Sequence, residues 1–163
     1  MSTLKVGTIQ DHTNSNTAIS IDSSGHVSHP VRPYFSYRQS GQSVATNAQT
    51  TFLHDTLISQ RGSDYNTGTG IFTAPITGLY NFNADVQIST ATQWQFFMQH
   101  SQSNGTGIRG YVGFNGQSGE KTTTASQSLT VQMTAGELML IRVTHFLGST
   151  QTLYGHFQGY FIG

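Results

Sequence analysis

The sequence contains no cysteine in its 163 residues, which excludes a disulfide framework and a thiolate zinc site. Charge is also scarce, because Lys, Arg, Asp and Glu together make up only 9% of the chain, whereas roughly 25% is typical of soluble domains. Seven basic residues balance seven acidic ones, so there is no basic excess to neutralise nucleic-acid phosphates or to attract an anionic membrane. We therefore expect neither nucleic acid nor a membrane surface as a partner.

Long apolar runs are missing as well. No stretch of about 18 apolar residues occurs that could form a transmembrane helix. The first eight residues also lack the apolar core of a secretory signal. Membrane insertion is therefore not expected for this chain.

Helical periodicity is nearly absent, because apolar residues hardly ever recur at positions i, i+3, i+4 and i+7. The clearest strand is predicted at residues 80–88, where Tyr80, Phe82 and Val86 share one face and polar residues the other. The same pattern predicts further strands at residues 34–38, 51–58, 94–100, 108–114, 126–133, 138–146 and 154–162. The chain is therefore predicted to be all-β, as a sandwich or barrel.

One predicted strand breaks the alternation. Leu138, Met139, Leu140 and Ile141 are consecutive apolar residues, as expected where a strand is covered on both faces. In a trimer, a neighbouring subunit could supply the second cover.

The first 32 residues differ from the rest, since their apolar side chains are thinly spread among Thr, Ser, Asn, Asp and His. Residues 19–27 nevertheless predict a β-hairpin with Ser24 and Gly25 in its turn. Such a hairpin needs partners, either from sister chains or from a larger assembly. Pro30 and Pro33 mark a boundary, which predicts an anchor segment at 1–32 and a head at 33–163.

The head carries a dense motif at residues 64–82, in which Gly70 precedes Phe-Thr-Ala-Pro and Gly78 begins Gly-Leu-Tyr. This motif resembles the central signature of C1q globular heads, and residues 33–36, 129–137 and 157–162 follow in that family's order. The resemblance implies a ten-stranded C1q/TNF-like jelly-roll sandwich. It also implies a homotrimer about a threefold axis that binds other macromolecules through exposed loops.

Within this motif, Pro75 and Gly78 fit a turn between two strands, and large aromatic side chains supply buried surface. The residues predicted to form the packing and the trimer core are Phe72, Leu79, Tyr80, Phe82, Phe157 and Tyr160. Glu137 stands where the family more often has Asp, which is a mild departure at a turn. The collagen-like stalk of the family is missing, because no Gly-X-Y repeat occurs upstream.

The N-terminal segment carries a second, shorter resemblance. Residues 3–10 and 18–30 are similar to the lead-in before C1q-like heads in bacteriophage virion proteins, notably those of marine and cyanobacterial phages. This similarity implies a virion location in which the anchor contacts other virion proteins.

Patterns for catalysis or for a cofactor are weak. The seven histidines show no familiar metal-ligand spacing, so no metal is expected, although one histidine per chain or a calcium ion on the threefold axis stays an open alternative. Residues 105–110 match G-x-G-x-x-G formally but lead into a strand rather than a helix. No Gly-x-Ser-x-Gly elbow occurs. We therefore expect neither a cofactor nor an enzyme.

Two functions remain after these exclusions. The first is a phage tail-fibre knob that attaches to a host-surface glycan or protein, and the second is a capsid decoration protein that stabilises the phage head. For the knob, the candidate receptor contacts are Tyr65, Asn104, Arg109 and Tyr111. Trp94 could also stack on a sugar, but Phe96 and Met98 follow it at strand spacing, so we expect it in the core. A third class, a hydrolytic depolymerase, would have to release sugar from the host envelope.

Overall fold

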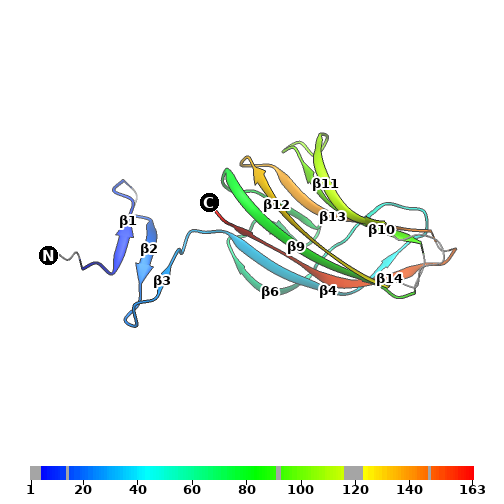
Figure 1. Ribbon diagram of the computed structural model, residues 1–163, viewed down its shortest axis with the longest axis horizontal. Helices are drawn as coiled ribbons and strands as arrows, with labels where there is room; N and C mark the ends of the chain where they lie inside the picture. The colour runs from blue at the N-terminus through cyan, green and yellow to red at the C-terminus, as the bar shows by residue number, and fades with distance from the viewer. Residues whose placement is uncertain (1–4, 14, 91–92, 116–122, 147) are drawn as a thin grey trace. The chain divides into compact units, whose positions relative to one another are not determined.

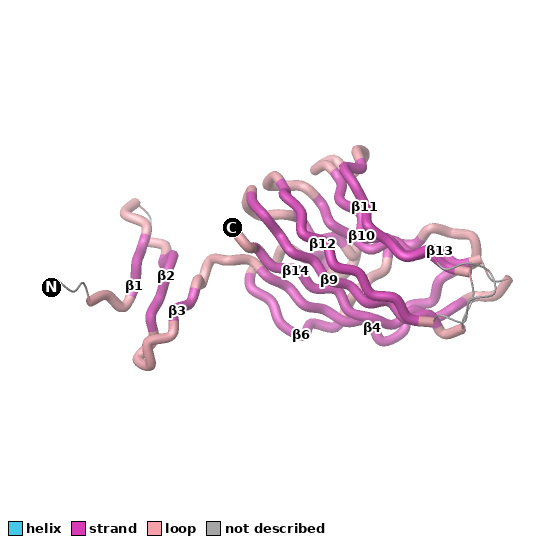
Figure 2. The backbone as a smooth tube through the Cα atoms, viewed as in Figure 1, coloured by secondary structure: helices cyan, strands magenta, loops and turns pink. Residues whose placement is uncertain are grey.

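A computed structural model of the chain describes residues 5–13, 15–90, 93–115, 123–146 and 148–163 (Figure 1). All regular structure among these residues is β-strand (Figure 2), which confirms the predicted all-β class. The described residues contain no helix of the length and apolarity needed to cross a membrane. The chain divides into two compact units, Met1–Arg32 and Pro33–Gly163.

The N-terminal unit is a three-stranded antiparallel sheet in the order β1-β2-β3. Its strands are β1 (Thr8–Gln10), β2 (Thr17–Ile21) and β3 (Val27–Ser28). In the turn between β2 and β3, the Asp22 carboxylate accepts hydrogen bonds from the backbone N–H groups of Ser24 and His26. Gly25 adopts a positive φ of 84° there, a conformation that glycine reaches without steric cost. The predicted hairpin and its turn are confirmed.

The second unit, the head, is a sandwich of a six-stranded and a five-stranded antiparallel sheet. The six-stranded sheet contains β5 (Thr50–Thr51), β7 (Tyr65–Asn66), β8 (Ile71–Thr73), β10 (Trp94–Ser101), β11 (Ile108–Asn115) and β13 (Leu138–His145). The five-stranded sheet contains β4 (Tyr34–Val44), β6 (Thr56–Arg61), β9 (Gly78–Ile88), β12 (Thr124–Met133) and β14 (Gln151–Phe161). The predicted jelly-roll sandwich is confirmed, with eleven strands in the described residues where the resemblance implied ten.

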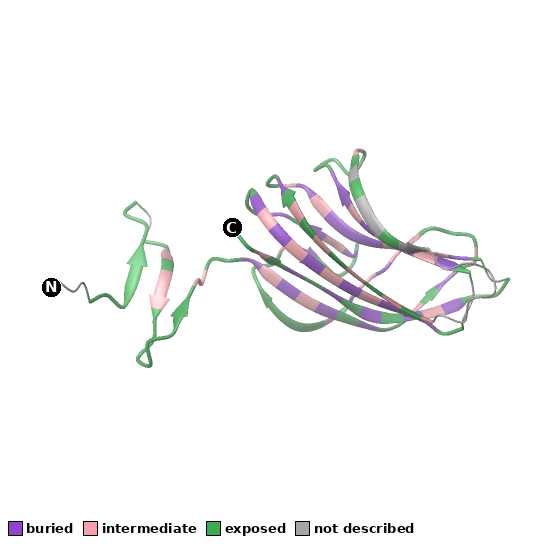
Figure 3. Ribbon diagram, viewed as in Figure 1, coloured by how far each residue is buried: buried purple, intermediate pink, exposed green. Residues whose placement is uncertain are grey.

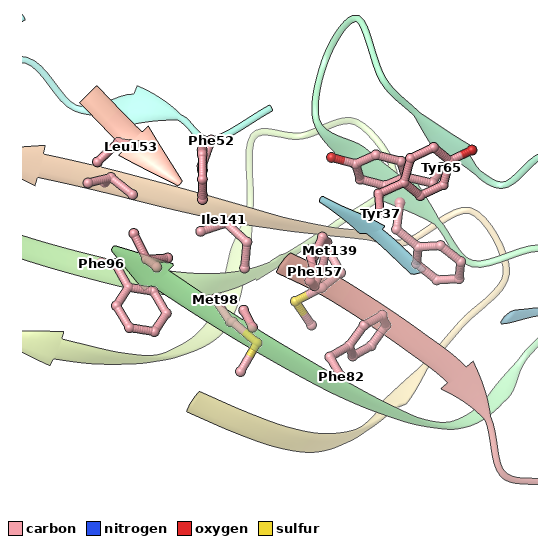
Figure 4. Close-up of a cluster of buried hydrophobic side chains, with 14 of the residues drawn as sticks. Tyr37, Phe52, Tyr65, Phe82, Phe96, Met98, Met139, Ile141, Leu153 and Phe157 are labelled. Carbon is pink, nitrogen blue, oxygen red and sulfur yellow. The ribbon is translucent and has the colours of Figure 1, made fainter. Parts of the chain in front are cut away.

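The core lies between these two sheets. Buried and more exposed residues alternate along the long strands of the head (Figure 3), as expected for strands with one covered face. Aromatic side chains dominate the core (Figure 4). The ring of Phe35 stacks on Phe72 at a centroid distance of 4.9 Å and meets Phe157 edge-on at 4.9 Å. Each such pair contributes about 0.5–1.5 kcal/mol beyond the area that it buries.

The prediction of one strand at residues 51–58 is wrong. The segment forms the end of β5 and the start of β6, which belong to opposite sheets. At the crossing, the side-chain amide of Gln42 donates to the Thr51 carbonyl at 3.0 Å and accepts from the Leu53 N–H at 2.8 Å. The Gln42 amide therefore forms hydrogen bonds with backbone groups at the point where the chain passes from one sheet to the other.

The second cover that was expected from a neighbouring subunit over residues 138–141 is not required. Leu140 points to the outer face of the six-stranded sheet, yet its exposed fraction is only 3% in the single chain. β13 is an inner strand of this sheet, so Gln99 of β10 and Ile71 of β8 lie on either side of Leu140. Leu140 is therefore covered within the single chain, as expected for a central strand.

The motif at residues 70–82 joins β8 to β9 through a turn. The Tyr80 hydroxyl donates to the Ile76 carbonyl at 2.7 Å and so closes this turn from within. Gly78 is needed for a close approach, because a Cβ atom at this position would overlap the ring of Phe161. The neighbouring Leu79 N–H donates to the Gly163 carbonyl at 2.7 Å. The motif therefore fixes the start of β9 against the end of β14.

Candidate binding surfaces

The outer face of the five-stranded sheet is polar, and its charged side chains include Asp85, Arg38 and Arg61, whose guanidinium lies 5.5 Å from the centre of the Tyr34 ring. Asn81 of β9 donates to the Thr130 hydroxyl of β12 at 2.9 Å and accepts from the Asn83 amide at 2.7 Å. Tyr160 of β14 lies on this face with 47% of its surface exposed. The ladder of uncharged side chains and an exposed tyrosine makes this face suited to contact with another protein surface.

A shallow pocket of about 360 Å³ lies in the same face. Its lining includes Asn83, Asp85, Ser126 and His156. The Nδ1 atom of His156 lies 3.2 Å from Oδ1 of Asp85, and both side chains are about half exposed. These two ionisable groups sit side by side on β9 and β14.

The outer face of the six-stranded sheet carries a second depression, of about 240 Å³, lined by Gln49, Phe97, Gln99 and Ile108. The ring of Phe97 lies over the backbone of Gly113 on β11, where a Cβ atom would overlap it. The Gln99 side chain donates to the Ser101 hydroxyl at 2.9 Å, which fixes the amide beside the ring. An aromatic ring next to an oriented amide is an arrangement that can stack on a sugar ring and bond its hydroxyl groups.

Arg142 of β13 is the cross-strand neighbour of Phe97 on this outer face. Its Nη1 atom donates to the Thr51 hydroxyl at 2.8 Å, whereas its Nε atom is covered and has no hydrogen-bond partner among the described residues. The guanidinium is therefore held in place and supplies positive charge beside the depression.

The structure corrects the prediction that Tyr65 contacts a receptor. Its exposed fraction is 5%, and its ring stacks on Phe35 at 5.1 Å with the planes 5° apart. The hydroxyl accepts from the backbone N–H of His54 at 3.1 Å, and burial raises the pKa of Tyr65. β7 is short, but Tyr65 holds its inward position opposite Phe72, so the side chain belongs to the core.

The other three predicted contacts lie between β10 and β11 or on β11. Asn104 is exposed, and its side-chain oxygen accepts from the Thr106 N–H at 3.1 Å, which stabilises the turn. Arg109 and Tyr111 are on β11, but their side chains lie outside the described part of the structure. The turn with Asn104 also borders a polar pocket of about 300 Å³ that reaches Thr134 and Glu137.

Four of the residues predicted for packing lie in the core, namely Phe72, Tyr80, Phe82 and Phe157. Leu79 is half-buried, and Tyr160 points outward. Trp94 is fully buried and stacks on Phe96 at 6.1 Å, as expected. Phe97 was not predicted as a binding residue, because Trp94, Phe96 and Met98 already accounted for the buried face of the strand. An apolar residue at an outward position was the signal that could have found it.

In the described part of the chain, no three His, Cys, Asp or Glu side chains gather as a metal site would require. His54 is buried between the sheets, and burial, with a contribution from His156, lowers its pKa to about 3. Residues 105–110 lie in a turn and at the start of β11. They therefore lack the helix N-terminus that holds a pyrophosphate.

The two facing sheets, the aromatic core and the polar outer faces define a jelly-roll head of the C1q/TNF type, a class that forms homotrimers and generally acts by binding rather than by catalysis. The sequence matches the C1q domain over residues 34–162, so this chain belongs to the C1q domain family. No curated protein sequence matches the chain.

Three solved structures show the same fold. The globular domain of zebrafish complement 1qA has a TM-score of 0.64 at 17% identity, covering 81% of this chain and 98% of that one. The PRD1 vertex protein P5 has a TM-score of 0.58 at 16% identity, covering 80% and 97%. The Eiger TNF of S. frugiperda has a TM-score of 0.53 at 13% identity, covering 81% and 94%.

Proposed function

We propose that this chain is a non-enzymatic, homotrimeric attachment protein of a virus particle, whose head binds a host-surface glycan or protein. The observation that carries the proposal is the depression around Phe97 on an outer sheet face of a C1q-family head. Its aromatic ring and neighbouring amide side chains suit the stacking and hydrogen bonding of a sugar ring. The likeness to the PRD1 vertex protein P5 and the phage-like N-terminal segment support the virion location.

The subunit contact of the trimer is assigned to the outer face of the five-stranded sheet. Protein interfaces are enriched in aromatic residues and depleted of charge. This face has the exposed Tyr160 and the uncharged Asn81 and Asn83, its Asp85 lies beside His156, and its Arg61 guanidinium lies over the Tyr34 ring. The six-stranded sheet, with Phe97, then stays open to solvent in the trimer.

Three copies of the Phe97 depression on one trimer favour attachment to a repetitive surface. Once one site is occupied, the other two bind at a high effective concentration, so weak contacts at each site add to a stable attachment. Only 9% of the residues are charged, and polar contacts without ion pairs are little weakened by salt.

A binding experiment tests the site itself. The purified full chain is applied to an array of bacterial surface glycans, together with the variants Phe97→Ala and Gln99→Ala. The matched control is Phe146→Ala, which removes an aromatic ring that is 42% exposed from the loop after β13, whereas Phe97 is half-buried. We expect Phe97→Ala to reduce binding at least tenfold and Phe146→Ala to leave it unchanged. Equal binding by the wild type and Phe97→Ala would remove this depression as the site.

The second candidate function is capsid decoration, which the likeness to a vertex protein also supports. Copy number separates the two functions. A few trimers in each purified particle agree with an attachment protein, whereas hundreds of copies agree with decoration of the shell. Incubation of the chain with host envelope tests the depolymerase class, because release of sugar would contradict a purely binding role.

A further inference from the structure

One face of the N-terminal sheet is entirely apolar. The register pairs Ile9 with Ile19 and Ile21 with Val27. Directly paired residues of an antiparallel sheet point to the same side, as do residues two apart in one strand, so these four side chains share one face. The opposite face is polar, and there Ser20 and Ser28 share a hydrogen bond at 2.6 Å.

Among the described residues of its own unit, nothing covers this apolar face. The exposed fractions are 49% for Ile9, 36% for Ile21 and 60% for Val27, and Ile19 is only half-buried. A three-stranded sheet with strands of two to five residues has too small a core to remain folded by itself. The sheet therefore needs another surface over its four β-branched side chains.

We propose that this face is covered by the same face of two other copies of the chain, so that three N-terminal sheets close into a prism with an isoleucine and valine interior. The proposal rests on the homotrimer of the proposed function. A threefold assembly brings identical faces together, and β-branched side chains of one kind pack against each other without leaving a polar group unpaired.

The short connection to the head favours sister chains as the occupant. Residues 29–33 alone separate β3 from β4, and five residues extend to at most about 18 Å. Two of these residues are the stiff Pro30 and Pro33. Three trimerised heads therefore hold their N-terminal sheets within a short distance of one another, where the effective concentration is on the order of millimolar.

The charges of the unit agree with this arrangement. The Asp22 carboxylate is occupied by the turn, where it accepts from two backbone N–H groups and lies 3.0 Å from the His26 ring. Asp11 likewise accepts from the Thr13 N–H in the loop after β1. The four positions of the apolar face contribute no charged group, so closing the prism buries no unpaired charge.

Cysteine cross-linking tests the prism, because the chain has no cysteine of its own. The variant Ile21→Cys places a thiol inside the prism, and its control Ser20→Cys places one on the opposite face of the same strand. Under mild oxidation of the purified full chain, we expect Ile21→Cys to give a disulfide-linked dimer within each trimer, at a yield independent of protein concentration. Ser20→Cys should stay uncross-linked under these conditions.

Light scattering on the same samples distinguishes a failure of the prism from a failure of the trimer. A trimer mass with cross-linking of Ile21→Cys supports the prism. A trimer mass without such cross-linking, or with equal cross-linking of Ser20→Cys, overturns the prism but leaves the trimeric head intact, and makes a shell protein the occupant of the face. A monomer mass overturns both.

Hydrogen exchange on the full chain gives a second readout that does not depend on an introduced cysteine. In the trimer, we expect the β2 amides to exchange at least tenfold more slowly in the wild type than in the double variant Ile21→Thr, Val27→Thr. Threonine keeps the β-branched shape favoured in strands, so the loss reports the apolar contact. Equal exchange in both proteins would contradict the prism.

Discussion

The Nε2 atom of His100 lies 2.9 Å from Oε2 of Glu137, and each side chain is only 6% exposed. The same carboxylate oxygen accepts from the Thr134 N–H at 2.9 Å, so one buried group joins β10 to the turn before β13. The sequence predicted only a mild departure from Asp at a turn, whereas the structure gives Glu137 two buried contacts. Its carboxylate reaches inward, and a buried carboxylate requires such partners.

Shortening this side chain is expected to cost almost as much as removing it. Glu137→Asp lacks one methylene group and no longer reaches His100, so we expect it to lower the free energy of unfolding by about 1–3 kcal/mol, close to the loss for Glu137→Ala. Urea denaturation measures the difference, and a double-mutant cycle with His100→Ala isolates the pair. A stability of Glu137→Asp equal to the wild type would contradict this role.

Because of His54, we expect the free energy of unfolding to depend on pH. Its pKa is about 3 in the folded chain, chiefly through burial, against 6.5 for an ordinary histidine. Below pH 6.5 the unfolded chain binds a proton that the folded chain does not, so stability is full above this pH and falls towards pH 3, by up to about 1.4 kcal/mol for each pH unit. Denaturation of the wild type and of His54→Leu between pH 7 and pH 4 measures this slope. A slope that His54→Leu leaves unchanged would assign it to other groups.

The crossing between the two sheets depends on Gln42. Because its amide both donates to Thr51 and accepts from Leu53, Gln42→Ala should lower stability by about 1–3 kcal/mol. Gln42→Glu keeps the acceptor but loses the donor, so an intermediate loss is expected. Gln93→Ala, at an exposed position just before β10, is the matched control and should lie within about 0.5 kcal/mol of the wild type.

Gly159 is expected to tolerate no side chain. A Cβ atom there would lie 2.5 Å from the Phe82 ring and 2.7 Å from the Phe35 ring, within the packed aromatic core. Gly159→Ala should therefore cost about 1–3 kcal/mol through overpacking, which thermal unfolding would record as a fall in Tm of several degrees. Gly148→Ala is the control, since no atom lies within 4 Å of its Cβ position. Equal melting of the two variants would argue against a tightly packed core at Gly159.

Strand positions could be predicted wherever one strand keeps one covered face. The strand predicted at 80–88 is observed as Gly78–Ile88, since alternation follows directly from the pleat. The prediction of one strand at 51–58 was wrong for a physical reason. Apolar and polar residues keep alternating through the crossing, while the strands that pair with the segment change from one sheet to the other. That change depends on Gln42, a residue distant in the sequence, which no local pattern reveals.

The candidate site was harder to predict than the fold. Tyr65 stands among Asn, Thr and Gly residues that suggest a loop, yet a two-residue pairing with β8 turns its ring into the core. Phe97 stands in a strand whose inward residues were already accounted for. Whether an aromatic side chain is buried in the core or lies on an outer face depends on its tertiary contacts, which the local sequence does not contain.

For an attachment protein of the kind proposed, the place of the linker has a mechanical consequence. A pull on the N-terminal unit reaches the head at the start of β4, which is bonded on one side to β14 and on the other to β6. β4 leaves the sheet only when the hydrogen bonds of both its edges are broken. How long an attached head survives tension is therefore set by its rate of forced unfolding rather than by its equilibrium stability.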